Sequence, residues 1–244
     1  MRPLRVVTWN VLHRVHAVNW SEDPVAAFPD ERVRIAGVTD MIVRWLANGV
    51  DAVCLQEVSG DQLASLRAAL AAGVHVFEHT YPCVPRLRGG GEPMLDDASE
   101  HLVVATTSAG ARLRDACTFD SDPGKGLLAV DLGGDVALVD THVSFGDRRG
   151  AQLATVARTA RSAAGGAIVV GDFNARADVV RAGLGGDVAI SELSGGRPTR
   201  VPTADHPAGQ TIDHVVVLGG AIVAAEVLDG RGLSDHEPVS ADVR

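Results

Sequence analysis

Five short apolar, β-prone runs, each next to polar side chains, constrain the fold of this chain most. The runs span residues 4–7, 52–55, 136–139, 167–170 and 215–218. The polar groups that follow or interrupt them, together with two more in the closing segment, are Asn10, Glu57, His142, Asp172, Asn174, Asp213, Asp235 and His236. Side chains at strand ends converge although they lie far apart in sequence. We therefore expect a sheet-based fold that gathers these groups into one site.

The residue types in this set favour phosphoester chemistry. The set contains amides, carboxylates and imidazoles, and no serine or cysteine stands beside a catalytic partner. Carboxylate and amide oxygens suit a hard cation such as Mg²⁺, whereas an acyl-enzyme requires an activated nucleophile. The set thus predicts metal-assisted hydrolysis of a phosphoester.

Length and composition indicate one globular domain over residues 1–244. Hydrophobic residues make up 46% of the 244 residues, and no long linker divides the chain. No stretch approaches the roughly 20 apolar residues of a membrane span, and residue 3 leads directly into an expected strand rather than a signal peptide. We expect a cytoplasmic monomer without a membrane partner.

Charge and aromatic content bear on the substrate. The net charge of −9 repels phosphate polyanions at long range, so phosphate binding requires local basic residues or a bound cation. Aromatic residues make up only 4%, which leaves few platforms for stacking unpaired bases. Both observations favour a compact substrate, such as a nucleotide, a nucleic-acid end or a phosphorylated metabolite, over a long duplex.

Apolar periodicity predicts the remaining elements. Helices are expected over 30–48, 59–72 and 149–163, with a short one after Asn174, and strands over 74–77, 101–106, 126–132, 136–140, 212–218, 221–227 and 237–243. Hairpins mixed with helical crossovers suggest two packed sheets with helices outside.

Two segments without periodicity, 81–100 and 191–210, are candidate substrate loops. Arginines in these loops and at the start of the third helix are candidate substrate contacts: Arg86, Arg88, Arg148, Arg149, Arg197 and Arg200.

Six motifs, in family order over residues 8–239, resemble those of the endonuclease/exonuclease/phosphatase (deoxyribonuclease I-like) superfamily. They are Thr8-Trp9-Asn10, Leu55-Gln56-Glu57-Val58, Asp140-Thr141-His142, Gly171-Asp172-Phe173-Asn174, Ile212-Asp213-His214 and Ser234-Asp235-His236. The resemblance implies a four-layer α/β sandwich, in which two packed mixed β-sheets are flanked by helices and the site lies at one edge of the sheets.

The same resemblance implies a divalent cation, Mg²⁺ or Mn²⁺. Glu57 would be the main metal ligand, with Asn10 and Asp235 completing or supporting the metal shell. This sparse set is physically adequate, because Mg²⁺ keeps several waters and uses few carboxylates.

The resemblance also assigns roles around the phosphate. Asp172 would orient or deprotonate the attacking water, and Asn174 would hold a phosphate oxygen. His142 and His236 would donate hydrogen bonds to the non-bridging oxygens, where charge builds in the transition state. Asp213 would orient His236 and favour its protonated form. Whether Asp172 or His236 is the base stays open.

Several alternatives remain at this point. Many abasic endonucleases of the superfamily carry an acidic residue where this chain has Leu12, which weakens a role in DNA repair. A DNA or RNA endonuclease or exonuclease is the alternative to a compact-substrate phosphodiesterase or phosphatase. A non-catalytic binding protein would show eroded motifs, and no amphipathic anchor supports a phospholipid enzyme. His214 is expected to serve packing, and Trp20 and Trp45 are expected to anchor the core or a loop.

Overall fold

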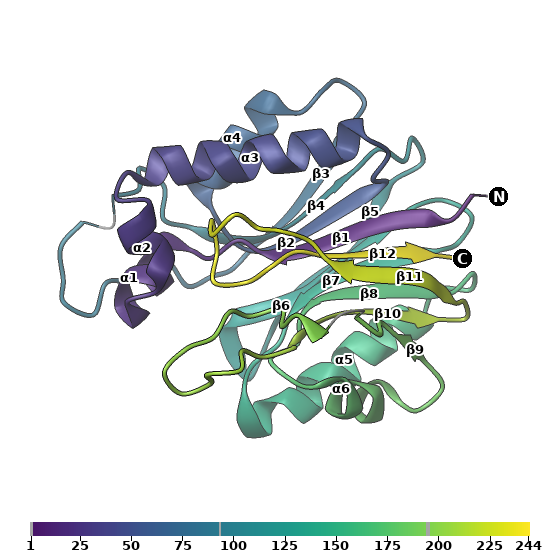
Figure 1. Ribbon diagram of the computed structural model, residues 1–244. Coiled ribbons are helices and arrows are strands. Elements are labelled where there is room, and N and C mark those ends of the chain that lie inside the picture. Colours follow the sequence, from purple (N-terminus) through teal and green to yellow (C-terminus); the bar gives the residue numbers. More distant parts are fainter. Residues whose placement is uncertain (1, 93, 194–195) are drawn as a thin grey trace.

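Two six-stranded mixed sheets packed face to face form the centre of the protein (Figure 1). The computed structural model describes residues 2–92, 94–193 and 196–244. The first sheet has the order β11 (Ile222–Val227), β12 (Val239–Val243), β1 (Leu4–Asn10), β2 (Ala52–Ser59), β4 (Glu100–Thr106), β3 (His75–Thr80). The second has the order β5 (Arg112–Phe119), β6 (Asp122–Asp131), β7 (Ala137–His142), β8 (Ala167–Asp172), β10 (Asp213–Leu218), β9 (Ala189–Ile190).

Helices cover the outer faces of both sheets (Figure 1). Helices α3 (Glu31–Ala47) and α4 (Gly60–Ala69) lie on the first sheet, and α5 (Arg149–Arg161) and α6 (Ala177–Leu184) lie on the second. The short helices α1 (Arg14–Trp20), α2 (Asp23–Ala27) and η1 (Gly146–Arg148) belong to the connections after β1 and β7. This arrangement is the expected four-layer α/β sandwich. No helix in the described ranges is long and apolar enough to cross a membrane.

Helix α3 shows how the local sequence specifies an element. The Asp30 side chain accepts a hydrogen bond from Arg32 N at 3.0 Å and caps the helix. Val38, Ile42 and Leu46 recur at helical spacing and are buried against the first sheet. The helix connects β1 to the parallel strand β2, because parallel neighbours require a crossover.

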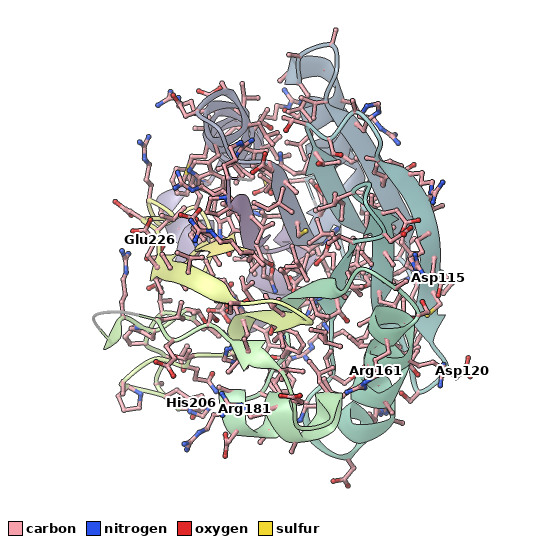
Figure 2. All side chains as sticks on the ribbon, turned by 90° about the vertical axis from the view of Figure 1, so that its right-hand side faces the viewer. Asp115, Asp120, Arg161, Arg181, His206 and Glu226 are labelled. Carbon is pink, nitrogen blue, oxygen red and sulfur yellow. The ribbon has the colours of Figure 1, made fainter. Side chains whose placement is uncertain are left out.

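The space between the sheets is filled by apolar side chains from both (Figure 2). Cys54 and Val104 of the first sheet belong to the same buried cluster as Leu128 and Val170 of the second. Charged side chains such as Glu226 instead lie at the periphery in this view. Strands buried on both faces explain why the central strands read as continuous apolar runs rather than as alternating ones.

A buried polar pair links the two sheets within this core. Gln56 Nε2 on β2 donates a 2.6 Å hydrogen bond to Asp140 Oδ1 on β7. Burial raises the pKa of Asp140 well above its ordinary value and thereby favours the neutral carboxyl group. The pair holds β2 and β7 together immediately beside Glu57 and His142.

The expected helices and strands are present, with ends that shift by a few residues; α1, α2, β5, η1 and β9 are additional elements that the sequence patterns do not predict. Strand β5 is an edge strand whose residues are exposed or half-buried except Phe119, and three of them are charged, so its sequence lacks a clear apolar pattern. Of the two roles expected for Trp20, a place in the core is wrong, because the residue is 63% exposed; its ring instead contacts Arg88 of the 81–100 segment. Trp45 does pack, edge to face, on Trp9 at 5.7 Å.

Candidate active site

The strand register brings the polar groups together at one edge of the sandwich. Strands β7 and β8 are parallel with His142 opposite Asp172, and β10 places Asp213 on the other side of Asp172. In the first sheet, Asn10 at the end of β1 lies opposite Gln56, the neighbour of Glu57. These ends open into a cleft of about 790 Å³, whose walls include residues 20–23 and 200–206.

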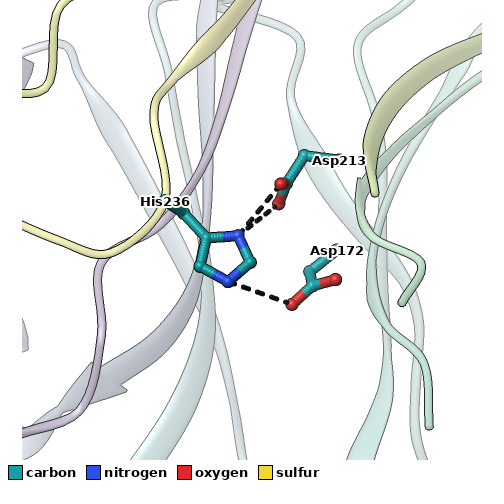
Figure 3. A group of neighbouring side chains, drawn as sticks. All are labelled: Asp172, Asp213 and His236. Carbon is teal, nitrogen blue, oxygen red and sulfur yellow. Dashed lines mark hydrogen bonds and ion pairs between the residues drawn. The ribbon is translucent and has the colours of Figure 1, made fainter. Parts of the chain in front are cut away.

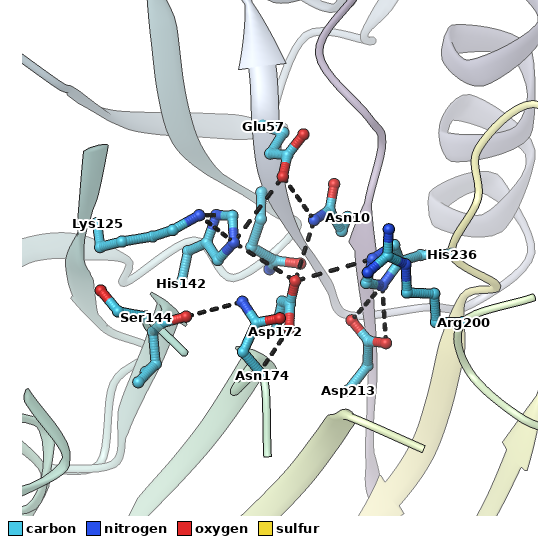
Figure 4. A network of polar contacts seen from close by, with 12 residues as sticks. Asn10, Glu57, Lys125, His142, Ser144, Asp172, Asn174, Arg200, Asp213 and His236 are labelled. Carbon is cyan, nitrogen blue, oxygen red and sulfur yellow. Dashed lines mark hydrogen bonds and ion pairs between the residues drawn. The ribbon is translucent and has the colours of Figure 1, made fainter. Parts of the chain in front are cut away.

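Asp172 is the centre of the cluster (Figure 4). Its Oδ2 accepts a 3.1 Å hydrogen bond from Asn10 Nδ2 and lies 3.4 Å from His142 Nε2 and 3.9 Å from His236 Nε2. Its Oδ1 accepts a 2.9 Å hydrogen bond from Asn174 N. Burial alone would raise the pKa of Asp172, but the imidazoles of His142 and His236 outweigh it and hold this pKa well below its ordinary value. Asp172 is therefore a buried, ionised acceptor.

His236 lies between two carboxylates (Figure 3). Its Nδ1 donates to Asp213 Oδ2 at 2.9 Å, and both side chains are buried. Burial opposes its protonation, yet Asp213, Asp235 and Asp172 raise the pKa of His236 to about 10. Potential ligand atoms of Asp172, Asp213 and His236 lie within 4.8 Å of one another. A protonated imidazole has no free lone pair, so we interpret this trio as a hydrogen-bonded array rather than a cation site.

Glu57 lines the cleft and occupies a strained backbone position. Its φ of 58° is in the left-handed region, beside a register shift between β2 and β4, and such strain accumulates at functional sites. Oε1 accepts from Asn10 Nδ2 and Oε2 accepts from His13 N, each at 3.1 Å. Burial opposes its ionisation, but His16 and His142 hold the pKa of Glu57 well below its ordinary value.

The donor set of the cleft fits a hard divalent cation. Glu57 supplies an ionised carboxylate, and Oδ1 of Asp235 is buried without a hydrogen-bond partner among the described residues. A buried carboxylate oxygen without a partner is costly unless a cation or water satisfies it. The Asn10 amide oxygen accepts from Leu12 N at 3.0 Å, and its nitrogen bridges Glu57 and Asp172. Asn10 therefore supports the carboxylates in this structure.

Two cationic side chains in the cleft, Lys125 and His16, are not among the site residues predicted from the sequence. Lys125, the only lysine of the chain, has its Nζ 2.6 Å from Nε2 of His142. His16 Nε2 lies 3.1 Å from Glu100 Oε2. Burial opposes its protonation, but Glu57 and Glu100 raise the pKa of His16 to about 9. Periodicity could not reveal either residue, although the isolated lysine in an arginine-rich chain was a usable signal.

The candidate substrate arginines divide into two groups. Arg200 lines the cleft, where Nε donates to Asp235 Oδ2 and Nη2 donates to Glu22 Oε1, both at 3.0 Å. Arg149 Nη1 donates to Asn174 O at 2.6 Å and thus supports the segment after β8. The cleft lining formed by the described residues does not include Arg86, Arg88, Arg148, Arg149 or Arg197.

His214 serves packing, as expected from its position. Its Nε2 lies 2.8 Å from Ala175 O, and its ring packs at 5.8 Å from Phe173. Burial lowers the pKa of His214 and thereby favours the neutral ring in the interior beneath the site.

The sequence model of the Endonuclease/Exonuclease/phosphatase family matches residues 7–236. The chain belongs to this family. Its order of motifs and its architecture agree with that membership, and the protein is accordingly a hydrolase of phosphoester bonds within the endonuclease/exonuclease/phosphatase family. Comparison with curated proteins found no match.

Several solved structures share the fold. They include TDP2 of D. rerio complexed with a single-strand DNA product (15% identity, 99% of this chain and 98% of that chain, TM-score 0.67). An endonuclease/exonuclease/phosphatase from Bacteroides vulgatus is similar at 18% identity (100% and 99%, TM-score 0.67). ANGEL2, a 2',3'-cyclic phosphatase in complex with adenosine-2',3'-vanadate, is similar at 14% identity (99% and 95%, TM-score 0.68). Members of the endonuclease/exonuclease/phosphatase family thus retain this fold at low identity.

Proposed function

We propose that this protein is a Mg²⁺- or Mn²⁺-dependent phosphoesterase that hydrolyses a compact phosphate ester, such as a nucleotide or a nucleic-acid end, by in-line attack of water. The observation that supports the proposal is the ionised Asp172 held between His142, His236 and Asn10 at the meeting point of the two sheets. An acceptor surrounded by donors is suited to orient a water against phosphorus.

Each side chain around Asp172 has a distinct part in this mechanism. Asp172 orients the attacking water and accepts its proton. His236, kept protonated by Asp213, donates to a non-bridging phosphate oxygen, and His142 with the adjacent Lys125 does the same from the other side. Donors fixed before the reaction stabilise the charge that develops in the transition state without reorganisation.

Glu57 is the principal residue that would hold the cation, with the free Oδ1 of Asp235 as a second oxygen donor. When bound, a divalent cation neutralises charge on the phosphate oxygens and acts as a Lewis acid. The Asn10 amide keeps the Glu57 carboxylate in place. Asn174, anchored through its Nδ2 to Val143 O at 2.8 Å, keeps its side-chain oxygen near the phosphate position.

The test is hydrolysis of a panel of mono- and diesters that includes nucleotides, inositol phosphates and labelled DNA and RNA. We expect turnover with Mg²⁺ or Mn²⁺ that is lost with a chelator and restored by added metal. Asp172→Asn should lower kcat by about 10²–10⁴-fold, the usual contribution of a positioned base. The matched control is Asp178→Asn, because Asp178 is an exposed carboxylate on α6. Turnover that survives both chelation and Asp172→Asn would refute the proposal.

A further inference from the structure

Two exposed aromatic side chains line the same cleft as Asp172. Trp20 is the last residue of α1 and is 63% exposed, and Phe145, three residues beyond His142, is 59% exposed. Exposing a large ring to water forgoes the favourable free energy of burying it. Exposed rings at a candidate active site therefore indicate a contact surface for a ligand.

The Trp20 ring is held in place by its neighbours. The guanidinium of Arg88 lies over the ring, 3.9 Å from its centroid. Asn19 anchors the segment that carries Arg88, because its Oδ1 accepts from Arg88 N and its Nδ2 donates to Arg86 O, both at 2.9 Å. A cation–π contact orients the ring and backs one of its faces. The exposed remainder is a preorganised stacking surface, which lowers the entropic cost of binding.

The groups around the rings favour a flat, polar ligand. Asp23, Asp205 and His206 are exposed on the rim, and Thr203 and Gln210 also line the cleft. A lipid chain would need a continuous apolar surface, whereas most of the residues that line this cleft are polar or charged. A heterocycle can stack its face on a ring and bond its edge to such groups. Carboxylates on the rim also repel additional phosphates at close range.

We propose that Trp20 and Phe145 form a nucleobase-stacking site, so that the substrate is a nucleotide with few phosphates. The inference rests on the proposed function for the position of the scissile phosphate at Asp172. The ring contacts identify the substrate class as a nucleotide. The low aromatic content of the chain did not suggest such a stacking site.

The test compares ligands with and without a base on the Asp172→Asn protein with Mg²⁺. Titration calorimetry with adenosine 5'-monophosphate and ribose 5-phosphate should show tighter binding of the nucleotide. Trp20→Ala should weaken nucleotide binding about tenfold, within the range measured for base–aromatic stacking, and leave ribose 5-phosphate unchanged. Trp20→Phe should retain most of the affinity, and Phe145→Ala should also weaken nucleotide binding. The matched control is Val223→Ala, because Val223 is exposed on β11 outside the cleft.

Three outcomes would overturn the inference. Equal affinity for the two ligands, or an equal loss for both in Trp20→Ala, would mean that the ring contacts no base. Higher affinity for an oligonucleotide of ten nucleotides than for a dinucleotide would exclude a compact substrate. Because binding is measured without turnover, these results are separate from the test of the proposed function, which is judged by hydrolysis, its dependence on the metal and its loss in Asp172→Asn.

Discussion

The buried charges of the site depend on one another residue by residue. Glu57 and Asp172 stay ionised because cationic groups lie beside them, and His16 and His236 stay protonated because carboxylates lie beside them. Replacing one charged side chain of this set by a neutral one leaves its partner as an unpaired charge in the interior, which strongly destabilises the folded protein. Stability and function at this site are therefore coupled through the same side chains.

His16 gives this coupling a measurable pH dependence. Its folded pKa of about 9 exceeds the ordinary value of 6.5, so the folded state binds the proton more tightly than the unfolded state. Its contribution to stability is complete below about pH 6.5 and is lost as the pH rises toward about 9. The difference in unfolding free energy between the wild type and His16→Gln should thus shrink over this range.

Urea unfolding at a series of pH values, with a chelator present, measures that difference. His75→Gln is the matched control, because His75 is exposed on β3. A difference that stays constant from pH 6 to pH 9.5 would show that His16 does not carry the extra proton in the folded protein.

At the scale of elements, Arg34 on α3 joins two segments of the active site. Its Nη1 donates to Val11 O at 2.6 Å and Leu233 O at 2.8 Å, and its Nη2 donates to Leu12 O at 2.7 Å. The side chain is buried and paired with Glu31. A helix on the outer layer thereby sets the path of the chain just after Asn10 and just before Asp235.

Replacing this arginine should affect folding and activity together. Arg34→Met leaves three carbonyl groups without this donor and removes the nearer of the two arginines paired with Glu31, the other being Arg14 at 3.5 Å. We therefore expect a loss of about 3–5 kcal/mol in unfolding free energy and a lower kcat. Urea unfolding and steady-state kinetics measure the two effects. Arg32→Met, which removes an exposed arginine from the same helix, is the control. Equal stability of the two variants would contradict the role of Arg34.

Over the whole molecule, the chain ends and the shared core favour a single cooperative unit. Strand β12, at the end of the chain, pairs with β1 near its start, and one apolar cluster contains residues of both sheets. Neither sheet can separate without exposing that cluster. We therefore propose that residues 1–244 unfold as one domain.

Urea unfolding followed by two probes tests this proposal. The three tryptophans, Trp9, Trp20 and Trp45, lie in the first 45 residues, whereas far-UV circular dichroism reports on both sheets. We expect the two transitions to coincide, as for a two-state unit. Phe173→Ala, in the core between the second sheet and its helices, should shift both midpoints equally, with a loss of about 3–5 kcal/mol. A shift in only one probe would show two independent units.

The sequence by itself determined the fold class and the central polar groups of the candidate site. Each of these groups adjoins an apolar run or stands in a motif, so that local pattern, residue type and motif order all pointed to one architecture. The helix with Val38 and Ile42 was likewise predictable, because its periodicity is local.

Only the tertiary structure decided which other residues lie beside these polar groups in the cleft. Lys125 reaches His142 because β6 pairs with β7 in a register that sets Gly126 opposite His142, and lateral register across strands is not encoded in the periodicity of either strand. Trp20 lines the cleft because a short helix, α1, follows β1 there. The sequence alone allowed this ring to anchor either the core or a loop, and only its position at the open edge of the sandwich leaves it exposed in the cleft.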